Sequence, residues 1–139
     1  MNKNNISIFD YEGIDFESVL KLLQEISSYE PDDKIKIKQK FCNNDNSYSI
    51  VAKKGEQVIG FGSVFIFERI RGGKCALLED IIVDKSFRNL KVGSLIVNTL
   101  VEYAISKKCF KVVLETSSKS FSFYEKLKFK KNGISMRRL

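Results

Sequence analysis

The chain contains no histidine among its 139 residues. Nucleophilic sites built on Ser–His or Cys–His pairs are therefore excluded, as are metal sites that depend on imidazole ligands. Any proton transfer has to use carboxylates, tyrosine, lysine, cysteine or water. The absence of histidine therefore limits the catalytic mechanisms that are open to this chain.

Cysteine is scarce and hydrophobic runs are short. The three cysteines, Cys42, Cys75 and Cys109, are odd in number and show no Cys-x-x-Cys spacing. This favours reduced thiols over a disulfide framework or a zinc site. No apolar run reaches the ~18 residues that a membrane span needs, and residues 1–5 lack the apolar core of a secretory signal. We therefore expect a cytoplasmic protein with no membrane span.

Basic residues outnumber acidic ones by 24 to 17, which gives a net charge of +7. No uninterrupted basic run is longer than two residues, and acidic residues separate the runs. This pattern favours a solvated basic surface, and no basic stripe with interleaved aromatics predicts a nucleic-acid partner. A ligand that carries several phosphates would account for part of the excess charge.

Composition and periodicity predict one α/β domain over residues 1–139. The 43% hydrophobic and 12% aromatic residues are typical of a folded protein, and no repeat or linker divides the chain. The predicted order is β-α-α-β-β-β-α-β-α-β, in which helices follow individual strands. We expect strands at residues 7–11, 48–53, 57–68, 75–83, 110–115 and 134–138. We expect helices at residues 16–28, 94–107 and 118–128.

Asp15 precedes the first helix and is expected to cap it. Residues 34–41 are ambiguous, because Ile35 and Ile37 alternate as in a strand, whereas Pro31 followed by two acids begins a helix well; we favour the helix. Two glycines at positions 60 and 62, inside a predicted strand, indicate a bulge or a close backbone approach.

The stretch at residues 78–93 predicts a buried strand, a polar turn and the start of a helix. Glu79 and Asp80 stand side by side before an apolar run. Because neighbouring strand residues point to opposite faces, both acids cannot be ordinary surface residues on a covered sheet. Arg88 and a helix that begins near Gly93 offer a cation and free backbone N–H groups, which suit a phosphate. The combination suggests proton removal beside a phosphorylated ligand.

This stretch also resembles a known family. Arg88-x-x-x-x-Gly93 after an apolar strand is similar to the acyl-CoA motif of the GNAT N-acetyltransferase superfamily. Within the superfamily, the glucosamine-6-phosphate N-acetyltransferases are most similar, through EDIIV at 79–83, CFKVVLE at 109–115, FYEK at 123–126, FKK at 129–131 and GISMRR at 133–138. These segments cover roughly the C-terminal half. The resemblance implies a single GNAT domain with a mixed sheet of six to seven strands flanked by helices.

Two of the departures from the superfamily pattern concern the cofactor. Lys91 stands where the motif has its first glycine, so that only Gly93 of the pair remains. A side chain is tolerated there if the backbone enters the helix in the right-handed region. Ser120 stands where relatives commonly place an asparagine that contacts the cofactor.

The resemblance implies transfer of the acetyl group of acetyl-CoA to the amine of glucosamine 6-phosphate, without a metal, for UDP-N-acetylglucosamine synthesis. It assigns catalysis to Glu79, Asp80, Glu115 and Tyr124. The carboxylates would hold or deprotonate the amine, and which of them is the base stays open. The tyrosine would protonate or hydrogen-bond the leaving thiolate. The structural alternatives are a turn contact for Asp80, a solvated strand end for Glu115 and helix packing for Tyr124.

The resemblance also implies two sets of binding residues. Contacts with acetyl-CoA would involve a strand backbone, a helix start and the last helix: Ile81, Ile82, Val83, Arg88, Asn89, Lys91, Val92, Gly93, Ser94, Ser120 and Tyr124. Contacts with the sugar phosphate would involve Ser27, Glu79, Asp80, Glu115, Arg137 and Arg138. The two arginines would act across a homodimer interface formed by the C-terminal strand; the alternative is a frayed basic tail.

Two other functions stay open. One is a GNAT acetyltransferase for another amine, such as a polyamine, an aminoglycoside or a protein N-terminus; the C-terminal arginine pair favours an anionic acceptor instead. The other is a non-catalytic domain that binds CoA or a partner. Lys91 in place of glycine keeps that reading open, whereas the presence of Glu79, Glu115 and Tyr124 speaks against it.

Overall fold

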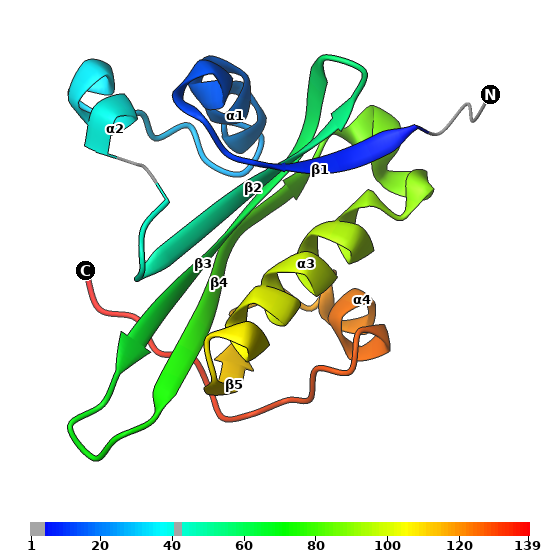
Figure 1. Ribbon diagram of the computed structural model, residues 1–139. Coiled ribbons are helices and arrows are strands. Elements are labelled where there is room, and N and C mark those ends of the chain that lie inside the picture. The colour runs from blue at the N-terminus through cyan, green and yellow to red at the C-terminus, as the bar shows by residue number, and fades with distance from the viewer. Residues whose placement is uncertain (1–4, 41–42) are drawn as a thin grey trace.

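A mixed five-stranded sheet forms the centre of the molecule (Figure 1). The computed structural model describes residues 5–40 and 43–139, so Cys42 lies outside the described residues. The strands follow one another across the sheet: β1 (Ile6–Asp10), β2 (Ser47–Lys54), β3 (Gln57–Glu68), β4 (Lys74–Val83) and β5 (Cys109–Val113). The first three pairings are antiparallel and β4–β5 is parallel. The predicted α/β class is confirmed, with five strands in place of six to seven.

The described residues form α-helices at the places where helices were expected: α1 (Phe16–Leu23), α2 (Lys34–Lys40), α3 (Val92–Ser106) and α4 (Phe121–Lys126). Two 3-10 helices, η1 (Gly13–Asp15) and η2 (Lys85–Leu90), precede α1 and α3. The ambiguous stretch is helical, as favoured. None of the described helices is long and apolar enough to cross a bilayer.

The expected cap by Asp15 is wrong. Its carboxylate makes no capping bond to α1 and instead accepts a hydrogen bond from the backbone N–H of Glu12 at 3.0 Å. It also lies 3.0 Å from the Nζ atom of Lys53 on β2. Asp15 is only 4% exposed, and a buried carboxylate needs such partners. Asp15 therefore ties the start of α1 to the sheet.

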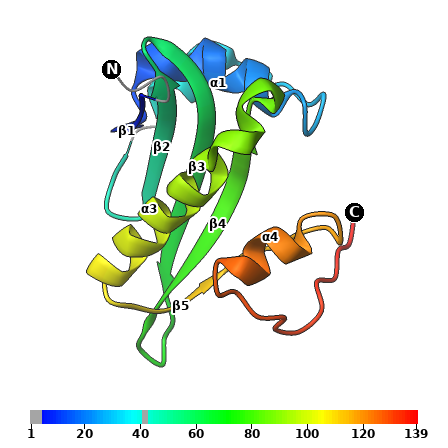
Figure 2. The same cartoon turned by 90° about the vertical axis from the view of Figure 1, so that its right-hand side faces the viewer.

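The predicted strand at residues 134–138 is absent. The segment after α4 runs past that helix without pairing with any strand of the described chain (Figure 2). Ile134 and Met136 are 88% and 91% exposed. A strand needs a neighbouring edge for its backbone groups, and an alternating sequence pattern does not supply one. The segment is therefore irregular in the single chain.

Helix α3 covers one face of the sheet. Ile96, Val97 and Leu100 are fully buried against β-strand side chains such as Ile50 and Val64. The two glycines of β3 confirm the predicted close approach, because a Cβ atom at Gly60 or Gly62 would lie 2.7 Å from the side chain of Ile96. A larger residue at either position would push α3 off the sheet.

The opposite face is only partly covered. At one end, Phe16 and Val19 of α1 are buried against Phe61 and Ile82 of the sheet. Further along, side chains on the same face reach solvent, among them Phe67, which is 45% exposed. Figure 1 shows α1 and α2 at the end of the sheet remote from the β3–β4 turn. This half-open face carries the candidate site.

Candidate active site

A β-bulge brings the two neighbouring acids of β4 to one face. Glu79 lies opposite Ser63 of β3, and Ile82 lies opposite Phe61, so Asp80 and Ile81 together oppose one glycine. Asp80 has a positive φ of 55°. The extra residue resets the alternation: Glu79 shares the face of Ser63, and Asp80 lines a hollow with Phe61. The expectation that neighbouring acids point to opposite faces is therefore wrong here.

The carboxylates of Glu79, Asp80 and Glu115 form an electrostatic cluster. Burial, with added repulsion from Asp80 and Glu115, raises the pKa of Glu79 above its ordinary value of 4.5. Burial also raises the pKa of Asp80 above 3.8. Both shifts follow from the cost of keeping negative charge away from water and beside other negative charge. A cationic ligand between these groups would relieve that cost.

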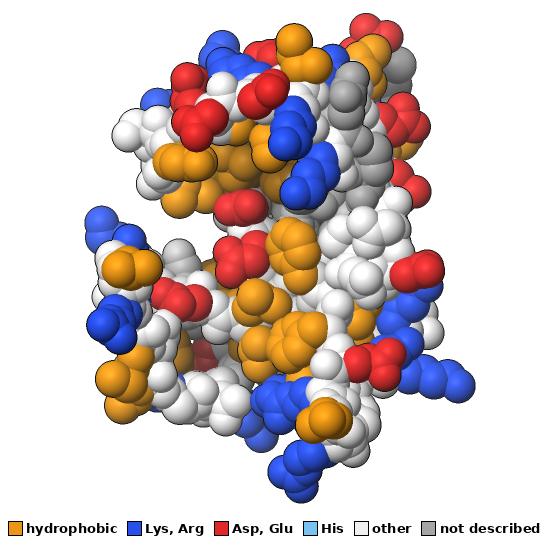
Figure 3. Space-filling view, turned by 90° about the vertical axis from the view of Figure 1, so that its left-hand side faces the viewer, with side chains coloured by type: hydrophobic (Ala, Val, Ile, Leu, Met, Phe, Trp, Pro, Cys, Tyr) orange, Lys and Arg blue, Asp and Glu red, His pale blue; other side chains and the backbone are white. Residues whose placement is uncertain are grey.

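Asp80 of this cluster lines a hollow beside α1. Figure 3 shows acidic side chains at the back of this hollow and hydrophobic ones above them. This hollow has a volume of about 550 Å³, and its lining includes Tyr11, Phe16, Ile37 of α2, Ser27 and Asp80. Ser27 accepts a hydrogen bond from the backbone N–H of Tyr29 at 3.2 Å. The structure thus brings Ser27 and Asp80 to one hollow, whereas sequence reasoning missed its apolar lining.

Strand β4 has a free edge beside this hollow. It pairs with β5 only from Lys74 to Leu77, opposite Cys109 to Val113. β5 ends at Val113, whereas β4 continues to Val83. Over residues 78–83, the backbone groups that face away from β3 therefore have no strand partner in the described chain. Such an edge can pair with the amides of an extended ligand, as expected for Ile81, Ile82 and Val83.

Beyond β4 the chain enters α3, and within the described part of the chain no backbone hydrogen bond is made by the N–H groups of its first turn. The first helical bond runs from the N–H of Leu95 to the carbonyl of Lys91 at 3.1 Å. The N–H groups of Val92, Gly93 and Ser94 precede that bond and suit an anion. Gly93 also allows a close contact, because a Cβ atom there would lie 3.1 Å from the ring of Phe123 on α4.

Lys91 adopts the left-handed conformation, with φ 60° and ψ 23°. The right-handed entry that would tolerate a side chain is therefore not what the backbone adopts. A residue with a Cβ atom costs about 1 kcal/mol in this region, where glycine is favoured. The chain keeps the glycine-like backbone of the motif although the glycine is gone.

Arg88 is held by protein groups. Its Nε atom donates to the carbonyl of Val83 at 3.1 Å, and its Nη2 atom donates to Glu25 on the turn after α1 at 3.3 Å. The guanidinium thus joins the end of β4 to the α1 region, with its remaining N–H groups available to a ligand. The side chain of the neighbouring Asn89 lies outside the described part of the chain.

Tyr124 lies on α4 with its ring between two phenylalanines. The ring centroids of Phe123 and Phe129 lie 4.9 and 5.8 Å away in edge-on geometry. Burial raises the pKa of the Tyr124 phenol above 10.0. Within the described residues its hydroxyl makes no hydrogen bond, which leaves it available to a ligand. Ser120 precedes α4 but does not cap it with its side chain, so its hydroxyl is also available.

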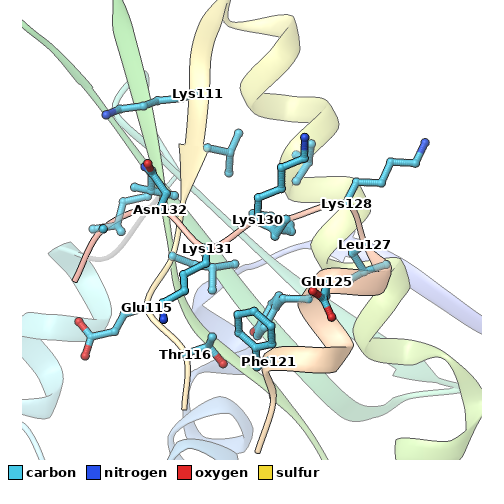
Figure 4. A pocket seen from close by; sticks show the side chains of 18 of the residues that line it. Lys111, Glu115, Thr116, Phe121, Glu125, Leu127, Lys128, Lys130, Lys131 and Asn132 are labelled. Carbon is cyan, nitrogen blue, oxygen red and sulfur yellow. The ribbon is translucent and has the colours of Figure 1, made fainter. Parts of the chain in front are cut away.

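The C-terminal segment encloses a second hollow along the outer edge of β5. Its volume is about 1060 Å³, and its lining includes Tyr124, Glu115 and Lys131. Figure 4 shows Glu115 projecting from the end of β5 and Lys131 reaching into the cavity beside Thr116. The Glu115 carboxylate accepts a hydrogen bond from the Ser135 hydroxyl at 2.6 Å. Lys131 was not predicted, because its place depends on the path of the segment after α4.

Arg137 and Arg138 lie exposed in this segment and form no ion pair within the described chain. Among all the described residues of the chain, no three or more His, Cys, Asp or Glu side chains are arranged to hold a metal ion. The described residues around the two hollows thus offer carboxylates, backbone donors, phenols and basic side chains.

Residues 16–129 match the acetyltransferase (GNAT) family. The chain belongs to this family. A glucosamine 6-phosphate N-acetyltransferase from Trypanosoma brucei brucei is 39% identical over 83 residues, 58% of this chain and 56% of the relative. One from Dictyostelium discoideum is 35% identical over 97 residues, 67% of this chain and 62% of the relative. The chain thus spans less than two thirds of the length of these two relatives.

Solved structures agree with the fold. Glucosamine-6-phosphate N-acetyltransferase from Arabidopsis thaliana superposes with a TM-score of 0.89 at 24% identity, over 97% of this chain and 98% of that one. An aminoglycoside N-acetyltransferase solved in complex with CoA superposes with a TM-score of 0.83 at 20% identity, over 97% and 94%. At these identities the two structures establish the fold of this GNAT chain and leave its substrate open.

Proposed function

We propose that this chain, acting as one domain over residues 1–139, transfers the acetyl group of acetyl-CoA to the amine of glucosamine 6-phosphate. The proposal depends on one observation: at the bulge of β4, a region that suits an acyl-CoA lies next to a group of carboxylates. A free strand edge and helix start suit an acyl-CoA, and the three-carboxylate cluster beside them suits an ammonium group. The relatives named for this reaction supply the identity of the acceptor.

Glu79 is the group that we assign as general base. The amine has to lose a proton before it attacks the thioester, and a carboxylate with a raised pKa accepts that proton more readily at neutral pH. Glu79 has such a pKa because it is partly buried and adjoins Asp80 and Glu115. Asp80 would hold the ammonium group, and Glu115 would accept a hydrogen bond from a sugar hydroxyl.

Tyr124 is assigned to the leaving thiolate. Its free hydroxyl, half-buried among aromatic rings, has a pKa above the ordinary value for a phenol. It therefore stays protonated at neutral pH and can donate to sulfur as negative charge develops.

The donor would lie along the free edge of β4 and over the start of α3. Acetyl-CoA supplies an activated thioester, and the protein supplies positioning. Backbone groups of Ile81, Ile82 and Val83 would pair with its pantetheine amides. The N–H groups of Val92, Gly93 and Ser94 face the region where its pyrophosphate would bind, with Arg88, Asn89, Lys91 and Ser120 at the periphery.

The sugar phosphate would bind to Arg137 and Arg138 of a second copy. Three observations support a homodimer through the C-terminal segment. β5 is an edge strand, a hollow of about 1060 Å³ runs along it, and Ile134 and Met136 of the unpaired segment are almost fully exposed. If the C-terminal segment of a second copy paired with β5, Ile134 and Met136 of that segment would be buried. Its arginines would then lie near the carboxylates of Glu79, Asp80 and Glu115.

A thiol-release assay with purified protein tests the proposal. Acetyl-CoA is supplied with glucosamine 6-phosphate, plain glucosamine or spermidine in parallel. We expect fast release with the phosphorylated sugar alone, because only that acceptor has both an ammonium group for the carboxylates and a phosphate for the arginines. The cytoplasm, where the product would enter UDP-N-acetylglucosamine synthesis, is the compartment that we infer.

The same assay separates the competing functions. Release with spermidine or plain glucosamine in place of the phosphorylated sugar would identify another acetyltransferase and overturn the acceptor assignment. No release with any amine, together with calorimetric binding of acetyl-CoA, would identify a non-catalytic CoA-binding domain.

A further inference from the structure

The turn between β3 and β4 projects at the end of the sheet opposite α1 (Figure 1). Side chains around this turn are both cationic and hydrophobic, and Figure 3 shows the two kinds mixed at the lower end of the molecule. None of them takes part in the proposed reaction. We define the hairpin patch by six of these side chains: Phe67, Arg69, Ile70, Arg71, Phe110 and Lys111.

The tip of the hairpin patch is aliphatic and held in place. Ile70 is 106% exposed, which is complete exposure, and Phe110 on the neighbouring β5 is 60% exposed. Two backbone hydrogen bonds close the turn, from Arg69 N–H to the Gly73 carbonyl at 3.2 Å and from Gly72 N–H to the Arg69 carbonyl at 2.8 Å. The Phe110 ring lies against this turn, because a Cβ atom at Gly73 would lie 3.0 Å from it. Apolar side chains that are exposed together mark an interaction surface, whereas single ones do not.

The cations of the hairpin patch are unpaired. In the described chain, no carboxylate lies within ion-pair distance of Arg69, Arg71 or Lys111. Arg69 and Lys111 instead lie 5.9 and 5.7 Å from the ring centroid of Phe110. Glu68 is the one acidic residue between positions 67 and 74. The patch therefore presents several free positive charges around an apolar tip.

We propose that the hairpin patch docks the protein onto an anionic lipid surface. Its cations would meet headgroup phosphates, while Ile70 and the two phenylalanines enter the boundary between headgroups and acyl chains. A nucleic acid would stack its bases on the two phenylalanines, but it offers no apolar environment for Ile70, the most exposed side chain of the patch, so a lipid surface fits better. Glu79 lies further along β4, about 17 Å from the turn at ~3.3 Å per residue, so docking leaves the hollow open.

Vesicle co-sedimentation tests the proposal. The probe is phosphatidylcholine vesicles with or without phosphatidylserine, at low and high salt. We expect binding to the anionic vesicles only, with release at high salt. Ile70→Ser should weaken that binding about tenfold, and Arg69→Gln with Arg71→Gln about 25-fold, at about fivefold for each charge.

Matched variants at the other end of the molecule serve as controls. Ile14→Ser removes another exposed isoleucine, 83% exposed on η1, and Lys36→Gln with Lys38→Gln removes two charges from α2. Both should bind anionic vesicles like the parent chain, and Ile70→Ser should keep the parent's elution volume and acetyl transfer rate. The proposal is overturned if anionic vesicles are not bound, or if Ile14→Ser weakens binding as much as Ile70→Ser. It is also overturned if Ile70→Ser changes the oligomeric state or abolishes oligonucleotide binding instead.

Discussion

The two halves of β4 differ although they belong to one strand. From Lys74 to Leu77 the strand is paired on both sides, with β3 and with β5. From Leu78 onward it contains the bulge at Asp80 and has a free edge. The first half stabilises the sheet. The second half lacks the pairing with β5, so its backbone groups are free on that edge, and its two acids lie on one face. The candidate site is thus built from an interruption in regular structure.

Glu79→Gln, in the second half of β4, should cause the largest loss of activity. The amide keeps the shape of the side chain and cannot accept a proton, so we expect kcat with glucosamine 6-phosphate to fall by about 10³-fold. Steady-state thiol release measures this. Glu102→Gln on the exposed face of α3 is the control and should leave kcat unchanged. An active Glu79→Gln enzyme would move the base to Asp80 or Glu115.

Leu78→Ala should be the most damaging change for stability near the junction of the two halves. Leu78 is 3% exposed in the core beneath α3, and a cavity there should lower the free energy of unfolding by about 3 kcal/mol. Leu77→Ala, one residue earlier on the half-open face, should lower it by about 1 kcal/mol. Urea denaturation measures both. Equal losses would contradict the assignment of the two faces.

Lys91→Gly should stabilise the fold. Glycine adopts the left-handed conformation without the Cβ penalty, so we expect the free energy of unfolding to rise by about 1 kcal/mol. Lys85→Gly, in η2, is the control and should lower it, because that backbone does not require glycine. A loss of stability in Lys91→Gly would show that the lysine side chain stabilises the turn by more than the backbone strain costs.

The smallest effect concerns pH. The raised pKa of Glu79 means that the folded state binds its proton more tightly than the unfolded state, so ionisation at neutral pH disfavours the fold. Glu79→Gln should therefore be more stable than the parent at pH 7. This advantage should shrink as the pH falls through the raised pKa towards the ordinary 4.5. Denaturation at both pH values measures it; an advantage that does not change with pH would argue against the shift.

Local patterns predicted most of the fold. Periodicity located α1, α3 and the five strands, because burial on one face leaves a regular trace in the sequence. Helix α2 was favoured from Pro31 and the two acids after it, since its own pattern was ambiguous. The last strand was not confirmed, since strand formation by residues 134–138 needs an edge that the single chain does not provide. Glu79, Asp80 and Glu115 lie close enough to interact electrostatically, while their roles in a site stay a prediction. The expectation that Glu79 and Asp80 point to opposite faces was wrong, because of the bulge.

The missed features depend on long-range geometry. The bulge at Asp80 arises from the register between β3 and β4, which no short window of sequence contains. The left-handed backbone at Lys91 contradicts the preference of its own residue type. The pairing of Arg88 with Glu25 joins positions far apart in the chain. Each of these is a tertiary constraint that overrides a local preference.

Hydrogen exchange of β4, with and without CoA, tests the central claim most directly. We expect slow exchange for the amides of the first half in both states, because β3 and β5 pair with them. In residues 78–83, the alternate amides that face away from β3 should exchange quickly in the free protein and at least tenfold more slowly with CoA bound. Slow exchange of these amides without CoA, or no change when calorimetry shows CoA bound, would contradict the account.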